Sequence, residues 1–240
     1  MGENIVIAGG TGNVAREVIE AILARDMHNV IVFTRKSRHS AGVDAILSFI
    51  VVYRDPGNVA QKNLIDAAIE AGVMRFAPSE WGFKSYDGLP SMHGKEEARR
   101  YLEDINEDKK VLEYTLFQPG LFLDYFAHPY APTRYLTTFC TQLDFEHRGS
   151  IQIDDGSHPV VLTLVSDVAA IVSLAIEYKG EWPVVGGIKG SRTSDAELLK
   201  LGEELRGPFK ADTVSEDDIM NGVLYSSWVP KIDHPSIPLG

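Results

Sequence analysis

The feature that most constrains this chain is a glycine-rich turn close to its N-terminus. The apolar run Ile5–Ala8 leads through Gly9-Gly10-Thr11-Gly12 directly into a helical pattern that starts at Asn13. Glycines permit a tight turn and let backbone N–H groups approach a pyrophosphate, and the helix N-terminus carries a partial positive charge. The small residues of the turn, together with Ala15, fit the dinucleotide-binding fingerprint. An ordinary strand-to-helix turn is the alternative, but this position in the chain favours a nucleotide site.

The cofactor contacts expected from this pattern come from the turn and the first helical turn, at Gly9, Thr11, Gly12, Asn13 and Val14. The end of the second predicted strand decides between the two nicotinamide nucleotides, because an NAD site usually carries Asp or Glu there. This chain has Arg35 and Lys36 instead, and cations suit a 2′-phosphate. A solvated basic loop is the alternative. Because the protein as a whole is acidic, cations at this position favour a binding role, and we expect NADPH as the cofactor.

Composition excludes several classes of partner. The 240 residues are 44% hydrophobic and carry a formal net charge of -11, so neither a nucleic acid nor a membrane surface is an expected partner. The single cysteine, Cys140, cannot form an internal disulfide, and the N-terminus has no signal-peptide pattern. Val160–Ile176, the most membrane-like stretch, contains a serine and an aspartate. We expect a soluble cytoplasmic protein without a metal site.

The first half of the chain alternates apolar runs with helical patterns, as a parallel sheet with crossover helices does. Further strands are predicted at Val30–Thr34, Ala45–Tyr53, Val73–Ala77 and Tyr114–Gln118. Helices are predicted at Asn13–Arg25, Val59–Ala71 (ended by Gly72) and Lys95–Ile105. The fold class is therefore α/β, a Rossmann-type, mostly parallel sheet with flanking helices.

The second half is less regular. Ser166 is a predicted helix cap, Ser194 opens a capping box that leads to a helix ending at Gly207, and Ser215 resembles another helix start. We expect a small irregular C-terminal substrate lobe over residues 121–240, partly woven into the sheet, after a nucleotide-binding domain over residues 1–120.

Several longer motifs resemble the NmrA-like, isoflavone-reductase-like atypical short-chain dehydrogenases, particularly fungal members. Beside the glycine turn, they are Leu64–Ala68, Arg75–Gly82 (the Pro-Ser-Glu-Trp-Gly stretch), Lys95 with Arg99–Leu102, Tyr114–Gly120, and Trp228–Pro230 with Asp233–Pro235. The resemblance implies NADPH-dependent reduction of a small phenolic or enone-bearing compound. It places the family's reactive lysine at Lys95, as a general acid or base whose pKa must be lowered by burial or nearby cations.

Other residues near this motif are weaker candidates. The tyrosine that usually precedes the lysine by four residues is replaced by Ser91. Tyr86 is expected only at the mouth of the site, His93 is a proton relay or a solvated loop residue, and Ser79 and Glu80 follow a strand at the ligand-binding sheet edge. For Glu80 a structural cap is the main alternative. Phe122, Tyr125 and Phe126 are candidate pocket walls, or core residues.

The chain departs from the family in two places. Only seven residues, Ser37 to Val43, separate Lys36 from Asp44, where relatives have a helix and a strand. Fully extended, they reach only about 23 Å. Without the family, the flanking strands would be interpreted as an antiparallel pair; with it, a block is missing and the second strand becomes an exposed edge. The chain also stops at Gly240, earlier than relatives do.

Three hypotheses follow. The first is an NADPH-dependent reductase that uses Lys95. The second is a non-catalytic NADP(H)-sensing regulator with a protein partner, and the third is an inactive, truncated paralogue.

Overall fold

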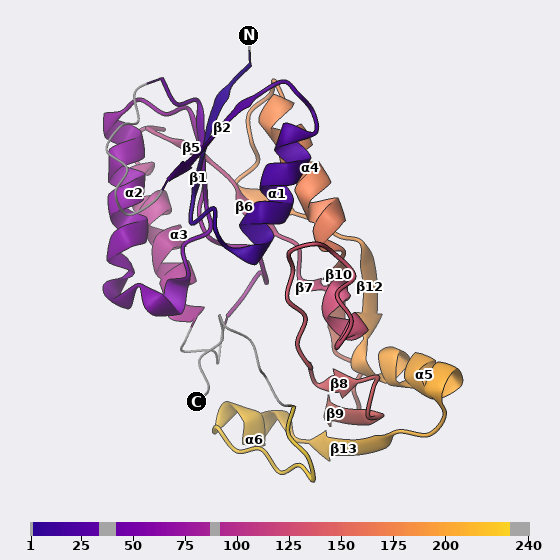
Figure 1. Ribbon diagram of the computed structural model, residues 1–240. Helices are drawn as coiled ribbons and strands as arrows, with labels where there is room; N and C mark the ends of the chain where they lie inside the picture. The colour runs from indigo at the N-terminus through magenta and orange to yellow at the C-terminus, as the bar shows by residue number, and fades with distance from the viewer. Residues whose placement is uncertain (1, 34–41, 87–91, 231–240) are drawn as a thin grey trace. The chain divides into compact units, whose positions relative to one another are not determined.

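The computed structural model describes residues 2–33, 42–86 and 92–230, which form two compact units (Figure 1). The first unit consists of Met1–Pro119 and Ser166–Ile188, and the second of Gly120–Val165 and Lys189–Gly240. A segment from the second half of the chain, residues 166–188, is thus part of the first unit. Among the described residues, no helix is both long enough and apolar enough to cross a bilayer.

The first unit is built on a parallel sheet of five strands in the order β2-β1-β3-β4-β5. The strands are β1 (Asn4–Ala8), β2 (Asn29–Phe33), β3 (Ala45–Ser48), β4 (Arg75–Ala77) and β5 (Glu113–Tyr114). In β1, Ile5 lies opposite Val30 of β2 on one side and Ala45 of β3 on the other. Burial on both faces explains why β1 and β3 are largely apolar rather than alternating. The predicted Rossmann-type α/β fold is confirmed.

Helices cover both faces of this sheet, and Figure 1 shows α1 (Asn13–Leu23) and α4 (Val165–Glu177) on one face, with α2 (Val59–Glu70) and α3 (His93–Ile105) on the other. Each helix turns an apolar stripe inward; in α1 the buried residues are Ala15, Val18 and Ile22. Gly72 follows α2 with φ at +67°, the left-handed conformation expected of a glycine after a helix end. The predicted helix positions are confirmed to within two residues.

The short connection after β2 does not produce an antiparallel pair. β2 and β3 lie on opposite sides of β1, and both run parallel to it, so the antiparallel interpretation is wrong. Burial decides the result, because all four residues of β3 are buried and a central place in the sheet covers both of its faces. β2 is the last strand of the described sheet, with Ile31 and Val32 about 40% exposed, as expected for an edge.

Three predicted strands are shorter or divided. The first is β4, which begins at Arg75 and not at the predicted Val73. The run predicted over Ala45–Tyr53 is a strand only to Ser48, and Val52–Arg54 forms a 3-10 turn. The predicted strand Tyr114–Gln118 breaks at Thr115, after which β6 (Leu116–Gln118) leaves the main sheet and pairs in parallel with β11 (Val185–Gly187). Hydropathy alone does not show such a change of partner.

The described part of the second unit contains two small sheets and a core of buried leucines, against which aromatic side chains pack. Its strands are β7 (Leu121–Phe122), β8 (Leu143–Asp144), β9 (Gly149–Ile153), β10 (Pro159–Thr163), β12 (Ser191–Ser194) and β13 (Lys210–Val214), and its helices α5 (Asp195–Arg206) and α6 (Glu216–Met220). The capping box predicted at Ser194 is present, with Glu197 as its partner. Ser215 caps α6 as predicted. Ser166 does not cap α4, because the helix already begins at Val165, whose N–H donates to the buried Asp124.

Candidate active site

The glycine turn takes the conformation that its sequence predicts. Gly9 has φ at +79°, and a Cβ atom there would lie 2.7 Å from the carbonyl oxygen of Phe49. A Cβ on Gly10 would lie 2.7 Å from Cγ1 of Val32. The loop therefore packs directly against the residues of β2 and the end of β3, and only glycine fits at these two positions.

The start of α1 is open to an anion. Gly12 is the N-cap, so no side chain caps the helix, and its first turn contains no acidic residue. Thr11 and Gly12 are exposed, while Asn13 and Val14 are half-buried. An uncapped helix N-terminus behind a glycine turn is a favourable place for a phosphate group. These residues fit the pyrophosphate of a dinucleotide.

Lys95 lies in the first turn of α3, at the edge of the sheet where β3 and β4 end. Its Nζ donates a hydrogen bond to the backbone carbonyl of Glu80, three residues after β4. The ammonium also lies 5.1 Å from the ring centroid of Tyr86. The side chain is thus fixed by one carbonyl and one aromatic face, rather than solvated on an exposed helix.

Burial and the nearby Arg99 guanidinium lower the pKa of Lys95 from 10.5 to about 8, although the Glu80 carboxylate acts in the opposite direction. Such a value lets the amine give up and regain a proton near neutral pH, which an ordinary lysine does not do. From the sequence, we expect that burial or nearby cations must lower the pKa of this lysine, and here both of them do so.

Glu80 is a buried carboxylate that is paired with Arg99. Its side chain has no exposed surface, and Arg99 donates from Nη2 at 2.5 Å and from Nε at 3.1 Å to the same oxygen, Oε2. Arg99 also donates to the backbone carbonyls of Phe83 and Lys84. A buried charge of this kind requires its partner, so the pair ties α3 to the loop after β4. Glu80 is therefore not a helix cap.

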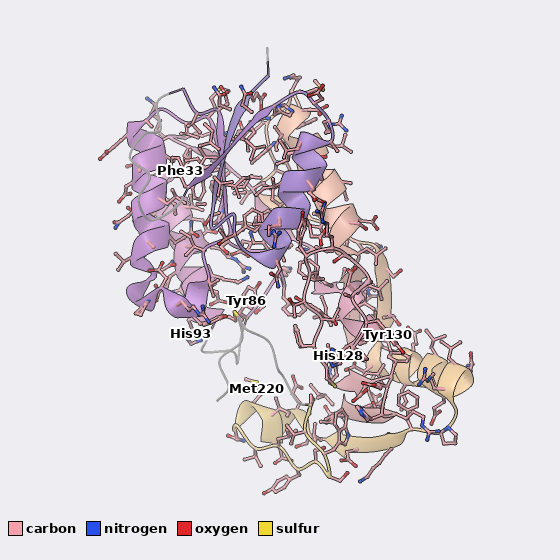
Figure 2. The ribbon with its side chains drawn as sticks, viewed as in Figure 1. Phe33, Tyr86, His93, His128, Tyr130 and Met220 are labelled. Carbon is pink, nitrogen blue, oxygen red and sulfur yellow. The ribbon has the colours of Figure 1, made fainter. Side chains whose placement is uncertain are left out.

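Tyr86 is a core residue of the site rather than a residue at its mouth. It is 3% exposed, and Figure 2 shows it, like His93, at the end of the first unit where α3 begins. Its hydroxyl accepts from the Phe83 N–H at 3.0 Å and lies 3.3 Å from the Glu80 carbonyl, to which it donates. Burial and Glu80 raise the pKa of this hydroxyl, so it remains a neutral hydrogen-bond donor.

Trp81 joins this loop to the strands beneath it. Its ring stacks on Phe49 at 4.3 Å and on Phe117 at 5.4 Å, and its Nε1 donates to the Ser48 carbonyl at 2.7 Å. Gln61, buried in α2, accepts from the Ser48 hydroxyl at 2.9 Å. Because Phe49, which follows β3, also contacts the glycine turn, the turn and the Lys95 site lie at the same end of the sheet, where the strands have their carboxyl ends.

Not every sequence candidate lies in this site. Arg35, Lys36 and Ser91 lie outside the described residues. His93 is exposed at the start of α3 (Figure 2). The three aromatic candidates pack inside the second unit, with their rings in edge-to-face or tilted contact with one another or with nearby phenylalanines; they are Phe122, Tyr125 and Phe126.

Arg99, Trp81 and Gln61 are site residues to which the sequence alone gives no role. Arg99 carries a usable signal, because it lies four residues after Lys95 and so on the same face of the helix. For Gln61, the signal is a polar residue within a helix that must cover a sheet. For Trp81, nothing in the sequence predicts the stack.

Comparisons with known proteins agree with this fold. No family model matches the chain. The oxidoreductase swnN of the fungus Metarhizium robertsii is 28% identical over 250 residues, covering 85% of this chain and 73% of the relative. Among solved structures, an isoflavone reductase superposes with a TM-score of 0.68 at 19% identity, covering 95% of this chain and 84% of that one. AtPrR2 with NADP+ and (+)-pinoresinol gives a TM-score of 0.66 at 19% identity, covering 91% and 80%.

Proposed function

We propose that this chain, which has the fold of the isoflavone-reductase-like reductases and resembles fungal oxidoreductases, is an NADPH-dependent reductase of a small phenolic or enone-bearing compound. The observation that supports it most is the partly buried Lys95, with its lowered pKa, at the same end of the sheet as an open glycine turn. A lysine with only a structural role needs neither feature.

The cofactor would be held through its pyrophosphate by the backbone of the turn and of the first helical turn, at Gly9, Thr11, Gly12, Asn13 and Val14. Arg35 and Lys36 would provide the charge for a 2′-phosphate. NADPH, when bound, supplies a hydride. The presence of NADP+ in a structure of the same fold supports this choice.

Lys95 would supply the proton. Its Nζ is held by the Glu80 carbonyl, and this keeps the ammonium in place until a substrate oxygen that gains negative charge can accept the proton. The Glu80–Arg99 pair fixes the helix that carries Lys95, and Tyr86 covers one side of the ammonium with its ring. Each group thus holds the lysine at one position and limits the access of water.

A phenolic or enone substrate fits this chemistry. Reduction of an enone by hydride leaves an enolate, whose oxygen requires a proton donor with a pKa near that of Lys95. The pinoresinol bound to AtPrR2 is a ligand of the phenolic class and supports the same substrate range. A non-catalytic NADP(H) sensor remains the alternative hypothesis, which the following test separates.

A nucleotide titration tests the cofactor half of the proposal. We expect tight NADPH binding, weaker NADH binding, and loss of this preference in Arg35→Ala. The control is Arg192→Ala, which removes an exposed arginine of β12 in the second unit and should leave both affinities unchanged. Failure of both nucleotides to bind would reject the proposal. Binding without oxidation of NADPH by any compound in a broad enone panel would favour the sensor.

A further inference from the structure

Trp81 has an unusual backbone conformation. Its φ is +39°, a left-handed value that a bulky aromatic residue rarely adopts. Such a conformation persists only where the surrounding structure holds it. Here two stacked rings, Phe49 and Phe117, and the hydrogen bond to the Ser48 carbonyl hold the indole from the strands beneath.

The φ angle of Trp81 sets the direction of the Glu80 carbonyl. This carbonyl belongs to the peptide unit that joins Glu80 to Trp81, and rotation about the N–Cα bond of Trp81 turns that unit relative to the indole anchor. A change from +39° to an ordinary helical φ near -60° would turn the peptide by about 100°. The carbonyl would then point away from the ammonium of Lys95.

Two side chains depend on this one carbonyl. The Nζ of Lys95 donates to it, and the Tyr86 hydroxyl lies 3.3 Å from it. The Glu80 side chain serves a different group, because Oε2 of its carboxylate accepts both hydrogen bonds from the Arg99 guanidinium. Gly82 completes the arrangement, since a Cβ there would lie 2.5 Å from the Tyr86 hydroxyl. The loop from Glu80 to Gly82 is thus shaped around these two side chains.

We propose that Trp81 is a positioning residue for Lys95, acting through the backbone carbonyl of Glu80, which its strand-anchored left-handed conformation turns toward the lysine ammonium. The proposal rests on the proposed function, because it concerns the same lysine. It assigns the indole a role beyond packing, since a core tryptophan needs no left-handed backbone.

Competitive labelling of the Lys95 amine tests this directly. The full chain is treated with trace acetic anhydride across a pH series, and mass spectrometry gives the midpoint of Lys95 labelling. The wild-type midpoint is expected near 8. Trp81→Ala should move the Lys95 midpoint upward by half a pH unit or more, because the ammonium that is freed from the Glu80 carbonyl turns to water. Trp81→Gly should lie closer to the wild type, because glycine accepts a positive φ.

Three comparisons keep the result interpretable. Trp182→Ala removes another tryptophan of the first unit, which contacts Phe117 and donates to Ala175, and it should lower the melting temperature without moving the midpoint. Trp81→Phe keeps a stacked ring but loses the hydrogen bond, so we expect a smaller shift of the Lys95 midpoint than in Trp81→Ala. This variant serves as the test if the other Trp81 variants do not fold. An unchanged midpoint in all folded Trp81 variants would overturn the proposal. Equal shifts in Trp81→Ala and Trp81→Gly, or in Trp182→Ala, would overturn it too.

The labelling experiment is independent of turnover, because it needs neither nucleotide nor substrate. If the wild type reduces no compound, the proposed function fails while the Lys95 midpoints still decide the role of Trp81. If the wild type is active and the midpoints do not respond, the positioning role alone is rejected.

Discussion

Replacing Lys95 with methionine should stabilise the fold while removing its activity. The structure holds the Lys95 ammonium in a buried place that lowers its pKa from 10.5 to about 8. That difference corresponds to about 3 kcal/mol of folding free energy, which is lost at pH 7 to keep the amine charged in the folded state. Methionine has a similar length and no charge, so Lys95→Met avoids this cost.

The expected gain is smaller than this figure, because the Glu80 carbonyl loses its lysine donor and, within the described part of the chain, keeps the Tyr86 hydroxyl. A lost hydrogen bond costs about 1 kcal/mol, so the net stabilisation at pH 7 is about 2 kcal/mol. For a chain of 240 residues this raises the melting temperature by about 4–8 °C.

The pH dependence identifies the cause. Between pH 8 and 10.5 the unfolded lysine is still protonated while the folded one is not, so the unfolded state binds more protons and wild-type stability rises with pH relative to the variant. Below pH 8 the cost is constant, and at pH 10 less than about 1 kcal/mol of it remains. Urea titrations at pH 7 and pH 10 measure this. A variant no more stable than the wild type at pH 7, or an advantage that does not shrink at pH 10, would refute the reasoning.

Three further predictions follow from the same site. Turnover should fall about tenfold for each pH unit above 8, because only the ammonium form of Lys95 donates a proton; a flat profile from pH 7 to 10 in a stopped-flow NADPH assay would contradict this. Glu80→Gln should destabilise the fold by about 3 kcal/mol in urea titrations, because it leaves Arg99 without its buried anion, and should lower the labelling midpoint of Lys95 by removing a charge that raises its pKa. Gly9→Ala should cost about 2 kcal/mol and weaken NADPH binding, because alanine is strained at φ +79° and its Cβ meets the Phe49 carbonyl; unchanged melting and affinity would exclude the tight loop.

Local patterns predicted the parts of the fold that depend on local chemistry. The glycine turn, the helix that ends before Gly72 and the capping box at Ser194 each follow from residues close together in sequence. They were predictable because a turn, a helix end and a cap satisfy their own backbone groups.

Tertiary contacts decided the features that the sequence analysis did not predict. The strand after Tyr114 breaks because Leu116 pairs with Val185, some seventy residues away. Asp124, rather than Ser166, meets the first N–H of α4. The burial of Tyr86 depends on the Glu80 carbonyl, whose direction no hydropathy pattern encodes. Lys95 itself was identified by resemblance, and only its surroundings explain its lowered pKa.

The central claim is that Lys95 donates the proton in an NADPH-dependent reduction. The most direct measurement follows NADPH oxidation by the wild type and by Lys95→Ala with a panel of phenolic and enone compounds, after nucleotide binding has been measured for both. We expect the wild type to oxidise NADPH with at least one compound, and Lys95→Ala to bind NADPH with nearly unchanged affinity but to lose turnover. Equal turnover in the two proteins would contradict the claim.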